Sequence, residues 1–232
     1  MTPLERVARY SPARLSLNRA GASCSTSERL RFAVDHALAR DAVRRELDTS
    51  RLTGLLAERG IAARTVRSRA QSFDGHLLRP DLGRRLYLED RIALGPSREI
   101  AWVVADGLSA GAAERYVPTL LPLIGGIDSV TVVRHGRVAI GDEIGELTGA
   151  KLALVVLGER PGLSAAESLG VYVTYEPRIG RTDAERVCVS NIREGGLDLS
   201  QAADQVRVII SKALAERKTG VGTLGDKSLP QD

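Results

Sequence analysis

The chain has 232 residues, of which 43% are hydrophobic, so it can bury a sizeable core as one domain with an extension. Aromatic residues account for only 3% of the sequence, which predicts a core built from aliphatic side chains. The net charge of +4 comes from short basic runs mixed with acidic residues, and no recognised nucleic-acid-binding motif accompanies them, so nucleic acid is not an expected partner.

Helical patterns dominate the N-terminal part of the chain. Residues 1–25 are predicted to be irregular, because prolines and a cluster of small residues interrupt them. A strong helix, with Thr26 or Ser27 as its predicted N-cap, is predicted to extend to residue 47, because apolar residues recur at helical spacing. Its apolar face is formed by Leu30, Val34, Ala37 and Leu38. A second, short helix is predicted over residues 51–59, and residues 61–98 show a mixed pattern.

From residue 99 onward, strands and helices alternate. Strands are predicted over residues 100–105, 130–133, 152–157, 171–175 and 187–189. Helices are predicted over residues 111–124, 140–148 and 200–217. Because the connections between strands are long enough to hold helices, the pattern predicts a parallel sheet. The expected fold class is therefore α/β: a Rossmann-like parallel sheet flanked by helices over residues 99–220, a mainly helical N-terminal extension over residues 1–98, and a flexible tail over residues 221–232.

Polar, glycine-rich loops follow the predicted strands at residues 106–109, 135–138 and 158–162, and residues 188–191, on and after a later strand, are candidates to join them. In open α/β sheets, ligands bind beyond the carboxyl ends of the strands. The uncharged strand over residues 152–157 ends at Glu159 and Arg160, which lie between glycines and a proline. This edge is a candidate ligand site, although a simple pairing of Glu159 with Arg160 or with solvent explains these two residues equally well.

Several classes of protein are disfavoured by what the sequence lacks. Cys24 and Cys188 are too few and too far apart for a disulfide framework, and no Cys/His cluster suggests a metal site. No apolar run approaches the ~18–20 residues of a membrane span. The first residues lack the apolar core of a signal peptide. We therefore expect a cytoplasmic protein without a metal site or a membrane partner.

One short motif suggests a stand-alone serine hydrolase. Gly107, Ser109 and Gly111 match the nucleophile elbow, between a predicted strand and a predicted helix. Among the three histidines, however, only His135 lies downstream, at the end of the very next strand, which leaves little room for a catalytic pair. The simpler interpretation is that Ser109 caps the following helix. A hydrolase that uses Ser109 remains the alternative function.

Longer motifs point to a known family. They are RPDLGRRL at 79–86, ADGLS at 105–109, the segment 136–149 with GDEIGEL, GERPGL at 158–163, RTDAER at 181–186 and CVSNI at 188–192. In sequence and order, these motifs resemble the small subunit of ethanolamine ammonia-lyase, an adenosylcobalamin-dependent enzyme. Some members carry a longer N-terminal segment linked to packaging in a bacterial microcompartment, so location in the cytoplasm or inside such a compartment is left open.

The resemblance implies a set of cobalamin-binding residues. Val138, Glu159 and Cys188 occupy the positions of the family's cobalamin contacts. Neighbouring residues form a second group of expected contacts: Arg160, Arg137, Ser190 and Asn191. Glu159 would accept hydrogen bonds from the corrin amides, and Arg160 would hold its carboxylate or add a donor. Catalytic residues are expected on the large subunit and none on this chain.

The resemblance also implies a partner and a cofactor state. A large barrel-shaped subunit would hold ethanolamine, and this chain would cover the lower face of the cobalamin, with residues 1–98 docking on the large subunit and residues 99–220 binding the cofactor. The complex, expected to contain six copies of each subunit, would convert ethanolamine to acetaldehyde and ammonia by a radical mechanism. Because the Asp-x-His-x-x-Gly motif is missing from the sequence, the adenosylcobalamin is expected to be base-on, with its own benzimidazole as axial ligand.

Overall fold

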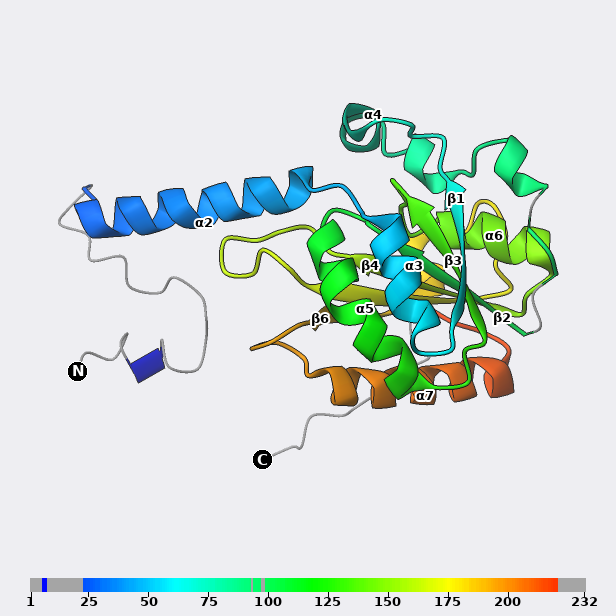
Figure 1. Cartoon of the computed structure of the whole chain (residues 1–232). Helices are drawn as coiled ribbons and strands as arrows, with labels where there is room; N and C mark the ends of the chain where they lie inside the picture. Colours follow the sequence, from blue (N-terminus) through cyan, green and yellow to red (C-terminus); the bar gives the residue numbers. More distant parts are fainter. Residues whose placement is uncertain (1–5, 8–22, 93, 97–98, 221–232) are drawn as a thin grey trace.

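The computed structural model describes residues 6–7, 23–92, 94–96 and 99–220. Helices cover both faces of one six-stranded sheet, which confirms the predicted α/β class (Figure 1). The predicted irregular segment before the first helix lies largely outside the described residues, and the predicted tail over residues 221–232 lies wholly outside them.

The elements before residue 99 are mostly helical. They are α2 (Thr26–Arg44), α3 (Thr49–Ala57), β1 (Ala62–Arg67), α4 (Phe73–Leu78), η1 (Leu82–Arg84) and η2 (Glu89–Arg91). The elements that follow are β2 (Ile100–Ala105), α5 (Ala110–Ile124), β3 (Ser129–Arg134), α6 (Ile140–Thr148), β4 (Leu152–Gly158), β5 (Leu169–Tyr175), η3 (Asp183–Glu185), β6 (Arg186–Ile192) and α7 (Leu199–Glu216). Every strand and helix predicted after residue 99 is present, with ends that differ by at most a few residues.

The strand order is β1-β3-β2-β4-β5-β6, and the first four strands in this order are parallel. β5 and β6 differ from the prediction, because each runs antiparallel to its preceding neighbour. The connection between β4 and β5, residues 159–168, contains no helix. A parallel return needs a long crossover, so the chain instead folds back beside β4.

The sheet also extends further toward the N-terminus than the sequence predicts. β1 lies within the predicted extension, yet it pairs in parallel with β3 along its whole length, from Ala62 beside Ser129 onward. Leu52 and Leu56 of α3 are fully buried in the same core as α5 and α7. The Rossmann-like layer therefore begins well before residue 99. The hydrophobic pattern did not predict β1, because it is an edge strand whose residues are mostly exposed.

Aliphatic side chains fill the core on both sides of the sheet, as predicted. β4 is buried along its entire length. One face of the sheet packs against α3, α5 and α7, and the other packs against α6 and Leu86. The main aromatic contributions are Trp102 and Tyr116.

α2 is the exception to this packing. The predicted helix is present, and Ser25 rather than Thr26 or Ser27 is its N-cap, but none of its residues is buried. In Figure 1, α2 projects away from the sheet. Its predicted apolar face is open to solvent, since Leu30, Val34 and Leu38 are 63%, 58% and 55% exposed. Most helical stability in proteins comes from the packing of an apolar face, and the apolar face of α2 is unpacked within the described chain.

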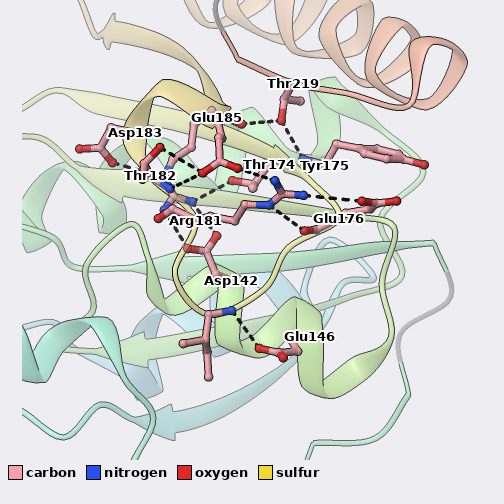
Figure 2. Close-up of polar contacts among 12 residues, drawn as sticks. Asp142, Glu146, Thr174, Tyr175, Glu176, Arg181, Thr182, Asp183, Glu185 and Thr219 are labelled. Carbon is pink, nitrogen blue, oxygen red and sulfur yellow. Dashed lines mark hydrogen bonds and ion pairs between the residues drawn. The ribbon is translucent and has the colours of Figure 1, made fainter.

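A buried ion pair ties α6 to β6. Both oxygens of Asp142 accept hydrogen bonds from the guanidinium of Arg186, at 2.5 and 2.7 Å, and each residue is less than a tenth exposed. Arg186 also donates to the hydroxyl of Thr174 at 3.0 Å and to the carbonyl of Arg181 at 2.9 Å. Figure 2 shows the surrounding network, in which Thr219 joins the segment after α7 to the same region.

Candidate functional site

The loops after β2, β3 and β4 line a cavity of about 500 Å³ at the carboxyl ends of the parallel strands. Its lining comprises Gly107, Leu108, Arg137, Val138, Leu157, Gly158, Glu159, Arg160 and Tyr172. Four of the predicted site residues, Val138, Glu159, Arg137 and Arg160, therefore meet around one space. The other three, Cys188, Ser190 and Asn191, lie on β6 and do not line the cavity itself.

Glu159 is fixed by the two strands beside it. Its Oε2 accepts a hydrogen bond from the hydroxyl of Ser168 at 2.7 Å and from the backbone N–H of Asn191 at 3.1 Å. Asn191 has a φ of +59°, which places it in the left-handed region. The described part of the chain contains no ion pair between Glu159 and the exposed Arg160, so the two residues do not simply pair with each other. The role of Arg160 toward a bound cofactor stays a prediction.

Tyr172 connects the cavity to Cys188. The two residues lie directly opposite each other on the paired strands β5 and β6. Burial raises the pKa of Tyr172, and Cys188 and Glu159 raise it further, so the phenol stays protonated at neutral pH. Sequence reasoning missed Tyr172; the strand alternation of LGVYVTY, with Tyr172 between buried neighbours, was the available signal.

A cluster of buried polar groups lies behind the cavity. The carboxylate of Asp106 accepts hydrogen bonds from the backbone N–H groups of His135 and Gly136, at 2.7 and 2.9 Å. The ring of His76 contacts the carbonyl of Gly107, and the His76 carbonyl accepts a hydrogen bond from Arg137 at 2.7 Å. Burial is the largest influence on His76 and lowers its pKa, which favours the neutral ring. Asp106 and His76 were not among the predicted site residues.

Ser109 does not have the surroundings of a nucleophile. Its exposed fraction is 0%, and its hydroxyl donates a hydrogen bond to the carbonyl of Ala166 at 3.4 Å. The ring of His135 contacts the carbonyl of Ala70 instead, at 2.8 Å. Ser109 is the N-cap residue of α5, as predicted, but its side chain makes no capping hydrogen bond. This geometry gives the hydrolase alternative no support.

The described residues contain no group of three or more His, Cys, Asp or Glu side chains that could hold a metal ion. Within the same residues, no helix is both long and apolar enough to cross a membrane.

Comparison with known proteins identifies close relatives over nearly the full length. Residues 1–223 match the family model described as the ethanolamine ammonia-lyase light chain. The ethanolamine ammonia-lyase small subunit of Rhodopseudomonas palustris is 45% identical over 97% of this chain and 91% of that protein. The corresponding small subunits of Azotobacter vinelandii and Bradyrhizobium diazoefficiens are 43% and 46% identical, over 94% of this chain and 87% and 88% of theirs.

Proposed function

Because the chain belongs to the ethanolamine ammonia-lyase light-chain family, we propose that it binds adenosylcobalamin and covers it at an interface with a larger, catalytic subunit. The observation that carries this proposal is the cavity shared by Val138, Glu159, Arg137 and Arg160. These residues approach one another only through the fold, since they come from the loops after two different strands.

The cavity lining suits the edge of a corrin ring. Corrin side chains end in amides, which both donate and accept hydrogen bonds. Glu159 offers an acceptor already oriented by Ser168 and Asn191. Arg137 and Arg160 offer donors, and Val138 and Leu157 offer apolar contact. A space of about 500 Å³ is too small to enclose a whole cobalamin, so a second surface must cover the rest of the cofactor.

The two subunits would have different roles in the reaction. When bound, the cofactor would supply the radical chemistry that converts ethanolamine to acetaldehyde and ammonia. This chain would orient the cofactor, in its base-on form, and help to exclude water from the reaction. We expect the ethanolamine site and the catalytic residues on the larger subunit. Assembly as six copies of each subunit, and packaging in a microcompartment, stay predictions.

Glu159→Gln tests the cofactor site. In the complex co-purified with its larger subunit, we expect the equilibrium dissociation constant for cyanocobalamin, measured by absorbance titration, to rise about 10- to 150-fold, because a hydrogen bond to a charged group contributes ~1.5–3 kcal/mol. Glu58→Gln, at an exposed residue that follows α3, is the matched control and should leave the constant unchanged. Equal affinities of the Glu159 variant and the wild type would remove Glu159 from the site.

The exposed face of α2 supports a role of the N-terminal region in docking. The C-terminal half of α2 borders a second cavity, of about 510 Å³, whose lining includes Leu38, Asp41 and the loop residues 165–167. The same loop between β4 and β5 begins with Glu159 and Arg160 at the proposed cofactor cavity. A subunit that covers the cofactor can therefore also reach α2.

Leu30→Glu combined with Val34→Glu tests this docking surface. We expect the double variant to lose most of its co-purification with the larger subunit, because two charges would be buried in an apolar contact. His36→Glu places a charge on the opposite side of α2, since two residues correspond to about 200° of helix rotation, and should assemble normally. Size-exclusion chromatography measures both, and normal assembly of the double variant would exclude this face of α2 from the interface.

A further inference from the structure

The carboxylate of Asp106 joins two loops that border the proposed cofactor cavity. Asp106 directly follows β2 and is only 6% exposed. Its Oδ2 accepts a hydrogen bond from the backbone N–H of His135 at 2.7 Å, and its Oδ1 accepts one from Gly136 at 2.9 Å. Both oxygens of one side chain are thus used to hold the backbone of the loop after β3.

The loop after β3 has a backbone conformation that must be held. His135 has a φ of +56°, a left-handed conformation that is unfavourable for a residue with a Cβ. At Gly136, a Cβ would lie 2.8 Å from the Cβ of Ala105, so this part of the loop is pressed against β2. Strained backbone of this kind persists where the surroundings determine it, and Asp106 supplies two of the contacts that do so.

The residues that come next are the ones that face the cavity. Arg137 and Val138 both line it, and so does Gly107, the residue after Asp106. The backbone N–H of Arg137 donates to the carbonyl of Gly83 at 2.8 Å, and its guanidinium donates to the carbonyl of His76 at 2.7 Å. A change in the backbone at residues 135–136 would therefore move Arg137 and Val138 relative to Glu159 across the cavity.

We infer that Asp106 is a positioning residue for cofactor binding: it holds the loop at residues 135–138 so that Arg137 and Val138 meet the cofactor. Asp106 acts through the backbone of that loop and lies outside the cavity lining. The inference rests on the proposed cobalamin-binding function. It requires a carboxylate, because an amide at this position has only one acceptor oxygen and would turn an NH₂ group toward one of the two N–H donors.

Asp106→Asn in the co-purified complex tests the inference. The equilibrium dissociation constant for cyanocobalamin should rise about 10- to 100-fold, while kcat at saturating adenosylcobalamin stays near the wild-type value. Asp204→Asn, at an exposed position on α7, is the matched control and should change neither quantity. Unchanged cobalamin affinity in Asp106→Asn, with or without a lower melting temperature, would reduce Asp106 to a structural residue and overturn the inference.

Two further variants separate the possible outcomes. His135→Gly in the Asp106→Asn background should recover part of the affinity, because glycine adopts a positive φ without strain. If Asp106→Asn fails to assemble, Gly136→Ala disturbs the same loop with the carboxylate intact and should raise the dissociation constant similarly; wild-type affinity in that variant would overturn the inference. A wild-type complex that binds no cobalamin would instead contradict the proposed function itself.

Discussion

Replacing Asp142 with alanine is expected to lower the free energy of unfolding by about 3–5 kcal/mol, because it leaves the charge of Arg186 buried without its partner. In the wild type, burial opposes that charge, but the hydrogen bonds to Asp142 and Asp183 raise the pKa of Arg186 above its usual value. In the variant the guanidinium still keeps its proton, because an arginine side chain is not deprotonated in proteins. For a chain of this size, the loss corresponds to a melting temperature about 6–20 °C lower.

Thermal unfolding of the full chain, co-purified with its larger subunit, measures this effect. Asp183→Ala removes a second carboxylate that lies 3.3 Å from Arg186, but the Asp183 side chain is 99% exposed. The control should therefore unfold close to the wild-type temperature, because solvent replaces an exposed partner. Combining Asp142→Ala with Arg186→Met should recover part of the lost stability, since no buried charge remains. Equal stability of the wild type and Asp142→Ala would show that the pair contributes nothing.

Gly107→Ala is expected to lower the free energy of unfolding by about 2–5 kcal/mol and to distort the cavity proposed to bind the cofactor. Gly107 has a φ of +56°, a left-handed conformation that costs a residue with a Cβ roughly 1–2 kcal/mol. The added Cβ would also collide with the carbonyl oxygen of Gly158, and overpacking of this kind costs typically 1–3 kcal/mol. Because Gly107 and Gly158 both line the cavity, we expect weaker cobalamin binding as well.

Gly54→Ala is the matched control for this substitution. Gly54 lies in α3, and a Cβ there would meet no atom within 4 Å. An alanine in a helix is more favourable than a glycine by about 1 kcal/mol, so this variant should unfold at the same or a higher temperature. Melting temperature and cyanocobalamin titration of both variants complete the test. If Gly107→Ala matched the wild type in melting temperature and in cyanocobalamin affinity, neither stability nor cofactor binding would require the close approach of the two loops.

The sequence predicts individual elements more successfully than their pairing. Hydrophobic periodicity located β2, α6 and β4 to within one residue, because each has a buried face or is buried all round. It did not find β1, whose residues are mostly exposed at the edge of the sheet. It also did not reveal that β5 and β6 run antiparallel, because strand direction depends on the length and path of the connecting loops.

The candidate site was predictable in part. The position of Glu159 after a buried strand, and the resemblance to a family, both pointed to the edge of the sheet where the cavity lies. The groups that hold Glu159 were not predictable, since Ser168 and the N–H of Asn191 reach it only through the pairing of β4, β5 and β6. Sequence adjacency also does not reveal whether Glu159 and Arg160 pair: they are consecutive, yet among the described residues the carboxylate of Glu159 is held by Ser168 and Asn191.

By itself, the sequence determined the α/β class, the family and the loops that carry the candidate site. Local periodicity and motifs are sufficient for these, because they record which faces are buried and which loops are polar. Only the tertiary structure decided that Asp106 would meet the backbone of His135, 29 residues away, that Tyr172 would lie beside Cys188, and that the apolar face of α2 would remain exposed. Hydrogen bonds between distant segments depend on sheet register and loop geometry, which the local pattern does not contain.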